Sequence, residues 1–168
     1  MKLFIGIKLP HSLKIKIHKA LQPIKKSEKG WEHAHDYHLT LLFIGEVTEE
    51  DLKKIKTILD EFELTPFDLQ TKNFEFFPRR VIYLSLYDPQ ELLELKKSID
   101  LRFKHWLKPQ TKPFLPHITV KRYQRYECEE LKKGINEHPF DSQKFPVLKL
   151  TLFKSEKDYM GNKYQEIY

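Results

Sequence analysis

The spacing of apolar residues in the first half of the chain changes in a regular order. Residues 2–9 are rich in β-branched and aromatic side chains, which predicts a strand. After Pro10 the apolar positions recur every three or four residues and predict an amphipathic helix. Residues 37–44 predict a second, buried strand, another amphipathic helix follows it, and residues 67–77 are predicted to be extended. The apolar positions of the two helices are Leu13, Ile17, Leu21 and Ile24, then Leu52, Ile55, Ile58, Leu59 and Phe62.

The second half repeats this order of elements. The pattern predicts a strand at 81–86, a helix with apolar positions from Leu92 to Trp106, a strand at 114–120, a shorter helix at 129–137, and strands at 147–153 and 164–168. A shift of 79 residues places Pro10 on Pro89 and His38 on His117. The chain therefore looks like an internal duplication.

The period of this duplication is too long for a solenoid repeat, so it favours two lobes rather than a repeat array. We predict an α+β, bilobal, duplicated fold in which each lobe has an antiparallel sheet with helices packed outside. A pseudo-twofold axis would relate the lobes and pass through a central catalytic cleft. The length of 168 residues fits one domain, 1–168, with approximate pseudo-repeat halves 1–79 and 80–168.

The composition indicates which kind of ligand and which cellular compartment to expect. The formal net charge of +6 favours polyanionic ligands, although most basic residues lie in Lys-rich helical stretches that are typical of a solvated surface. The single cysteine, Cys128, excludes an intrachain disulfide and a cysteine-based metal cluster. Neither the core of a signal peptide nor an apolar run long enough to span a membrane is present. We expect a soluble, cytoplasmic protein with no membrane partner, and nothing in the sequence requires more than a monomer.

Two motifs with the same pattern lie at equivalent positions of the halves, His38-Leu39-Thr40-Leu41 and His117-Ile118-Thr119-Val120. Because residues i and i+2 of a strand point to the same face, each histidine shares a face with its threonine while the apolar residues enter the core. Two such strands around a pseudo-twofold axis would present two imidazoles and two hydroxyls to one pocket. That arrangement suits a tetrahedral phosphate.

The chemistry of opening a cyclic phosphodiester with water matches these residue types. It requires a base that takes a proton from water, an acid that protonates the departing ribose oxygen, and donors to the non-bridging oxygens. Histidine suits both proton roles because its ordinary pKa of about 6.5 leaves both forms accessible near neutral pH. No serine or cysteine with a neighbouring base is apparent, so direct attack by water is simpler than a covalent intermediate. Residue types alone do not say which imidazole is the acid.

Other interpretations of the histidines stay open at this point. A lone histidine on an apolar strand is usually a packed or surface residue, but two copies at equivalent positions favour a shared chemical role. His33, His35 and His38 are close in sequence and would suit a metal ion, although His38 would not share a strand face with the other two. The alternative from another class is a module that binds RNA through its basic surface without turnover.

At this level of detail the chain resembles the two-histidine phosphoesterase superfamily, specifically the RNA 2',3'-cyclic phosphodiesterases, also described as 2'-5' RNA ligase-like proteins. The resemblance runs nearly end to end, and the doubled motif is its specific part. The supporting residues are Leu3-Phe4-Ile5, Pro10, Trp31, Phe43-Ile44-Gly45-Glu46-Val47, Phe77-Pro78, Arg80, Pro113-Phe114-Leu115-Pro116, Lys121-Arg122, Leu152-Phe153-Lys154-Ser155-Glu156, Gly161 and Tyr164. Residues 32–37 depart from the proline-containing link that is usual in relatives, and Tyr83 stands where tryptophan is frequent.

The resemblance implies a hydrolase that converts RNA 2',3'-cyclic phosphate ends to 2'-phosphate ends without a metal or cofactor. His38 would be the proton donor to the leaving 3' oxygen, and His117 would be the proton acceptor that activates water. Thr40 and Thr119 would hold phosphate oxygens, and the guanidinium of Arg122 would add charge and engage two oxygens.

The implied partners are RNA with 2',3'-cyclic phosphate ends or small cyclic nucleotides. Possible RNA contacts near the rim are Phe77, Arg79, Arg80, Tyr123 and Arg125, although packing is the more common role of such aromatic residues. Other superfamily activities remain alternatives: cleavage or ligation of 2'-5' linkages, or action on the cyclic phosphate of a nucleotide-sugar.

Overall fold

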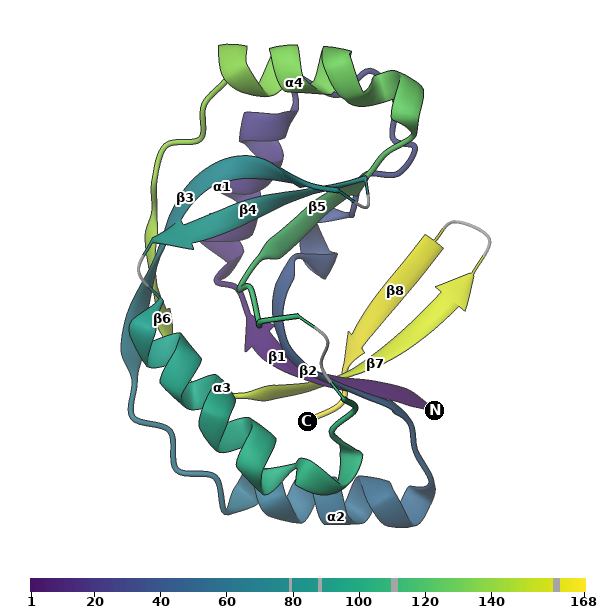
Figure 1. Ribbon diagram of the computed structural model, residues 1–168, viewed down its shortest axis with the longest axis vertical. Helices are drawn as coiled ribbons and strands as arrows, with labels where there is room; N and C mark the ends of the chain where they lie inside the picture. Colours follow the sequence, from purple (N-terminus) through teal and green to yellow (C-terminus); the bar gives the residue numbers. More distant parts are fainter. Residues whose placement is uncertain (79, 88, 110–111, 159–160) are drawn as a thin grey trace.

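The computed structural model describes residues 1–78, 80–87, 89–109, 112–158 and 161–168. Within these ranges one curved antiparallel sheet of eight strands has four α-helices outside it (Figure 1). The strands are β1 (Lys2–Lys8), β2 (His38–Glu46), β3 (Phe67–Phe77), β4 (Val81–Tyr87), β5 (Ile118–Arg122), β6 (Lys144–Val147), β7 (Thr151–Asp158) and β8 (Gly161–Glu166). The helices are α1 (His11–Leu21), α2 (Glu49–Asp60), α3 (Gln90–Arg102) and α4 (Cys128–Glu137), with short 3-10 helices η1 (Ala34–Asp36), η2 (Lys104–Trp106) and η3 (Arg125–Glu127). The predicted α+β class is confirmed.

The strand order is symmetric about the centre of the sheet. It runs β6-β3-β4-β5-β2-β1-β7-β8, so β5 and β2 meet in the middle and the sheets of the two lobes join edge to edge. β3 belongs to the first half of the sequence but pairs with β4, and β7 belongs to the second half but pairs with β1. The lobe with β4 and β5 therefore contains β3 from the first half of the sequence, and the lobe with β1 and β2 contains β7 and β8 from the second half. Figure 1 shows α1 and α4 at one end of the molecule and α2 and α3 at the other.

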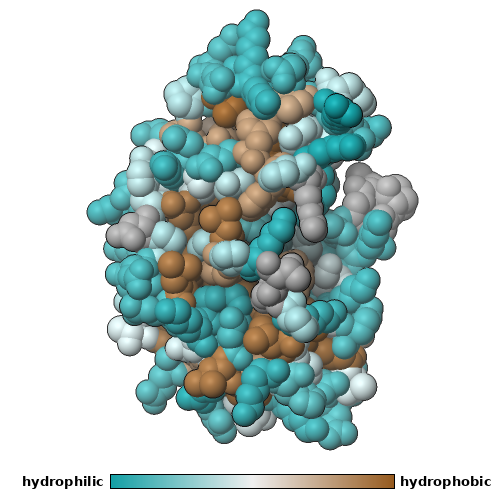
Figure 2. All heavy atoms as spheres, in the orientation of Figure 1, coloured by the Kyte–Doolittle hydropathy of each residue, from teal (hydrophilic) through white to brown (hydrophobic). Residues whose placement is uncertain are grey.

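The elements form where local patterns and burial agree. β1 has five consecutive buried residues, as expected of a strand that is covered on both faces. α1 buries Leu13, Ile17 and Leu21 along one face, the apolar positions of the predicted helix. α2 begins with a capping box between Thr48 and Asp51, which satisfies backbone N–H groups at the helix start. In the view of Figure 2, hydrophilic residues cover the top of the molecule, where α4 lies, and apolar residues gather in patches on the left and in the lower half.

Two of the predicted strands differ from the structure, and prolines account for the first difference. The strand predicted at 114–120 begins only at Ile118, because Pro113 and Pro116 lack the N–H group that a ladder requires. The strand predicted at 147–153 is two strands, and the first of them, β6, lies at the edge of the sheet. β6 contains Pro146, a residue that edge positions tolerate.

The described part of the chain contains no helix that is both long and apolar enough to cross a membrane.

Candidate active site

The two motifs meet at the seam between the lobes. β2 and β5 pair antiparallel through Leu39 and Ile118, the middle residues of the two motifs. Antiparallel pairing about this point places each histidine beside the threonine of the other motif. The alternation predicted from sequence is present, because Leu39 and Ile118 are fully buried while the flanking histidines and threonines are partly exposed. The four polar side chains therefore share one face of the sheet.

These side chains line one small cavity of about 80 Å³, which we call the histidine cavity. Its lining residues are Glu32, Asp36, His38, Thr40, Phe43, His117, Thr119, Arg122 and Tyr164. The structure thus brings together all five predicted catalytic and phosphate-binding residues, from β2, from β5 and from the residue that precedes β5. Four further lining residues, Glu32, Asp36, Phe43 and Tyr164, were not among the predicted site residues.

Each histidine is oriented by a hydrogen bond from its Nδ1 to a backbone carbonyl oxygen. Nδ1 of His38 lies 2.6 Å from the carbonyl oxygen of Asp36, and Nδ1 of His117 lies 2.7 Å from that of Leu115. A carbonyl oxygen only accepts hydrogen bonds, so each Nδ1 carries a hydrogen and donates it. Nε2 is then the nitrogen of each ring that remains available for proton transfer.

Aromatic rings fix the orientation of each imidazole from the side. The His38 ring lies 4.5 Å from the ring of Tyr164 in an edge-on arrangement and 4.8 Å from that of Phe4. The His117 ring lies edge-on to Phe77 at 5.0 Å and to Tyr83 at 5.7 Å. Such packing holds both rings in place before any ligand binds.

Burial lowers the pKa of both imidazoles, because it disfavours their charged forms. For His38 the result is a pKa of about 4, with the carbonyl of Asp36 opposing the shift and Lys14 adding to it. The pKa of His117 is lowered as well, with the carbonyl of Leu115 opposing the shift and Arg122 adding to it. The free protein therefore holds His38 in its neutral form at neutral pH.

The low pKa of His38 predicts a pH-dependent stability. Between pH 6.5 and pH 4 the unfolded chain binds a proton at this residue that the folded chain does not, so folding weakens as the pH falls through this window. Urea denaturation at pH 7.5 and pH 4.5 should show a loss of unfolding free energy that is about 2 kcal/mol larger in the wild type than in His38→Asn. Equal losses in the two proteins would contradict a buried, neutral His38.

Charged side chains around the cavity are of both signs. Nε of Arg122 lies 3.6 Å from Oε1 of Glu32, and the Arg122 side chain is 55% exposed whereas that of Glu32 is 13% exposed. Burial raises the pKa of the Glu32 carboxyl, and Arg122 opposes that shift. Asp36 is buried too, and its Oδ2 lies 3.3 Å from Nε2 of His35 but has no hydrogen-bond partner. Neither carboxylate carried a signal in the sequence, because only the fold brings residues 32–36 to β5.

The predicted RNA contacts are only partly near the cavity. Phe77 packs on His117 and lines a neighbouring cavity of about 500 Å³ together with Thr40 and Phe43. Tyr123 is buried and packs edge-on against Phe76, so it belongs to the core. Arg80 and Arg125 are exposed and line neither of these two cavities. Arg79 lies outside the described residues.

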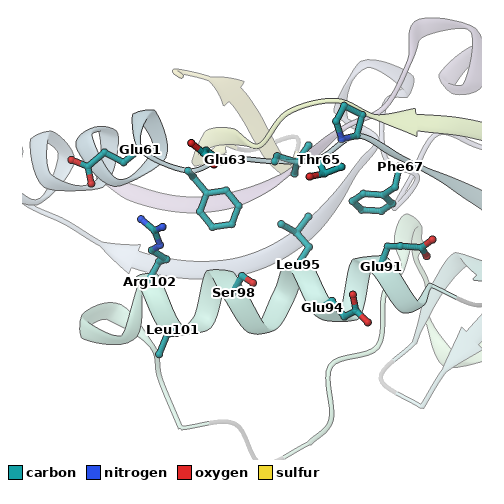
Figure 3. Close-up of a pocket in the computed structure, with 13 residues that line it drawn as sticks. Glu61, Glu63, Thr65, Phe67, Glu91, Glu94, Leu95, Ser98, Leu101 and Arg102 are labelled. Atoms are coloured by element: carbon teal, nitrogen blue, oxygen red, sulfur yellow. The ribbon is translucent and has the colours of Figure 1, made fainter.

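A larger groove of about 870 Å³ lies elsewhere, between α3 and the segment that follows α2 (Figure 3). It shares no residue with the histidine cavity. The charged residues that line it are Glu61, Glu63, Glu91, Glu94 and Arg102. An excess of carboxylates repels a polyanion, so size alone does not make this groove a site for RNA.

The predicted metal alternative has little geometric support. The rings of His33 and His35 stack with their centroids 5.4 Å apart, whereas His38 turns its Nδ1 to a carbonyl. Within the described ranges, no group of three or more His, Cys, Asp or Glu side chains is arranged to hold a metal ion.

Comparison with known proteins agrees with this fold. Residues 13–159 match the model of the 2'-5' RNA ligase superfamily, and the chain belongs to that superfamily. The RNA 2',3'-cyclic phosphodiesterase of Archaeoglobus fulgidus is 31% identical over 77% of this chain and 76% of its own. That of Methanocaldococcus jannaschii is 28% identical over 99% of this chain and 98% of its own. The predicted resemblance to this family is confirmed.

Solved structures with the same fold superpose on nearly the whole chain. E. coli LigT complexed with 3'-AMP superposes with a TM-score of 0.82 at 23% identity, covering 99% of this chain and 95% of LigT. The protein TT0787 of Thermus thermophilus superposes with a TM-score of 0.75 at 23% identity, covering 100% of this chain and 96% of its own. At this level of identity the likeness concerns the fold.

Proposed function

We propose that this protein hydrolyses 2',3'-cyclic phosphate ends of RNA to 2'-phosphate ends by metal-independent acid–base catalysis. The observation that carries the proposal is the histidine cavity itself, where two imidazoles with free Nε2 atoms lie beside two threonine hydroxyls and one guanidinium. The curated relatives with whole-chain similarity are named RNA 2',3'-cyclic phosphodiesterases, which supports the same reaction. LigT structures that hold 3'-AMP or phosphate support a phosphate-bearing nucleotide as ligand.

In the proposed reaction, Nε2 of His117 removes a proton from water as the water oxygen attacks phosphorus. The bond from phosphorus to the 3' oxygen breaks, and Nε2–H of His38 donates a proton to that oxygen. Thr40 and Thr119 donate hydrogen bonds to the non-bridging oxygens, and the guanidinium of Arg122 balances the charge that develops on them. The product is a 2'-phosphate with a free 3' hydroxyl, and the two histidines have exchanged protonation states.

The negative charge of the substrate favours the protonated form of His38, which the free protein lacks at neutral pH. His38 must be protonated to act as the acid, and a phosphate anion beside it favours the protonated form. The bound phosphate therefore raises the pKa of His38 from its value of about 4 in the free protein. The neutral ring of His117 is ready to accept a proton from water.

The lowered pKa values predict the pH profile of the reaction. The productive state of the free enzyme carries one proton on the histidine pair, which is the main form only between the two apparent pKa values of the pair. Because burial lowers the pKa of both rings, we expect a bell-shaped kcat/KM profile with its maximum below pH 6.5. A profile that rises continuously to pH 8 would argue against this histidine pair as acid and base.

The decisive experiment is a chelator-treated assay on a short oligonucleotide that ends in a 2',3'-cyclic phosphate. The expected product is the 2'-phosphate, identified by chromatography against 2'- and 3'-phosphate standards. A 3'-phosphate product would show that the other ribose oxygen leaves. Loss of activity on chelation would refute the metal-independent mechanism, and tight RNA binding without product would favour the binding module.

A further inference from the structure

The wall of the histidine cavity contains two carboxylates as well as one guanidinium. Glu32 and Asp36 both line the cavity, and both side chains are largely shielded from water, whereas Arg122 is more than half exposed. A buried charge is screened less than an exposed one, so the two carboxylates offset more of the positive potential than their number alone suggests.

The position of Glu32 is fixed by the backbone. Its N–H donates to the carbonyl oxygen of Val120 at 2.9 Å, and the neighbouring Trp31 forms an isolated bridge with Lys121 of β5. Nζ of Lys121 donates to the carbonyl of Lys29 at 2.8 Å and lies over the Trp31 ring. The backbone of Trp31 and Glu32 is therefore bonded to β5, which holds the carboxylate against the cavity rather than in solvent.

The substrate and the product of the proposed reaction differ in charge. A cyclic phosphodiester carries one negative charge, whereas a phosphate monoester carries close to two at pH 8, because its second pKa is about 6. A carboxylate in the cavity wall repels the product about twice as strongly as the substrate. Its effect is thus on selectivity between the two ligands, beyond any effect on affinity in general.

We infer that Glu32 is a specificity-determining residue that makes the cavity favour the singly charged cyclic diester and release the doubly charged monoester product. The inference rests on the proposed function for the identity of the two ligands. It assigns to Glu32 a role distinct from that of a residue that only positions Arg122, because positioning would serve both ligands alike.

The test measures equilibrium binding of 2',3'-cyclic AMP and of 2'-AMP at pH 8 by calorimetry. Both ligands are titrated into His117→Ala, in which the cyclic nucleotide persists, with and without Glu32→Gln. Even with the full dielectric screening of water, removing one charge at roughly 6 Å changes affinity about threefold per ligand charge. We expect Glu32→Gln to increase the affinity for 2',3'-cyclic AMP about threefold and the affinity for 2'-AMP about tenfold. Glu32→Asp, which keeps the charge, should retain the selectivity of the parent.

A matched control separates this local effect from the change in net charge. Glu94→Gln makes the same change in the acidic groove of Figure 3, which shares no residue with the histidine cavity, and it should leave both affinities unchanged. If Glu32→Gln weakens both ligands equally, or leaves their ratio unchanged, the inference is wrong. Hydrolysis by the wild type is a separate measurement, so a failure of the proposed function is distinguishable from a failure of this inference.

Discussion

Replacement of His117 by alanine is expected to lower kcat for a 2',3'-cyclic phosphate substrate by about 10²–10⁴-fold, the range that a positioned acid or base contributes. The same loss is expected for His38→Ala, because the pair acts as one unit in which each proton transfer requires the other. The structural reason is that each ring offers only one free nitrogen, Nε2, to the cavity. Hydrolysis rates under saturating substrate, measured with the Tm of each variant, provide the test.

His11→Ala is the matched control, because His11 is exposed at the start of α1 and lines none of the cavities described above. It should retain wild-type turnover. Turnover within a few-fold of wild type in a folded His38→Ala or His117→Ala protein would exclude that residue from proton transfer. Loss of turnover together with a large fall in Tm would instead point to a structural role.

Gly30→Ala is expected to lower the free energy of unfolding by about 3 kcal/mol, because a side chain there is both strained and obstructed. Gly30 has a φ of +78°, and an added Cβ would lie 2.1 Å from the carbonyl oxygen of Arg122. The carbonyl of Gly30 also accepts a hydrogen bond of 2.7 Å from the N–H of Arg122. The substitution therefore displaces the end of β5, and phosphate affinity should fall along with stability.

Gly45→Ala separates the cost of the backbone conformation from the cost of the steric contact. Gly45 has a φ of +93°, but an added Cβ there meets only the flexible end of Lys108 at 3.3 Å. It should cost about 1 kcal/mol, from the backbone conformation alone. Thermal unfolding of both variants, with inorganic phosphate binding by calorimetry, checks the prediction. Equal losses in the two variants would show that contact with the backbone of Arg122 contributes nothing.

The sequence was informative where the interactions are local. Periodic apolar positions predicted the helices α1 to α4. The alternation of polar and apolar residues in the two motifs predicted which side chains share a face. Strand ends were less predictable at 114–117 and 144–147, because the effect of a proline depends on whether its strand lies at the edge of the sheet.

Some residues of the candidate site were likewise predictable from the sequence, and others were not. The duplication pointed to His38 and His117 as partners with Thr40 and Thr119, and these four residues do line one cavity. The exchange of β3 and β7 between the lobes was not predictable, because strand pairing joins residues far apart in the sequence. The same holds for Glu32, Asp36 and Tyr164, whose approach to the histidines depends on the bonding of Glu32 to β5 and on the packing of η1 and β8.

What the sequence determined by itself is that each histidine shares a strand face with its own threonine, because the period of a strand is a property of the local backbone. Only the tertiary structure decided that the motifs meet at Leu39 and Ile118, that both Nδ1 atoms donate to carbonyls, and that burial lowers the pKa of both rings. The physical reason is that pairing, burial and electrostatics depend on distances in space, which a linear pattern does not specify.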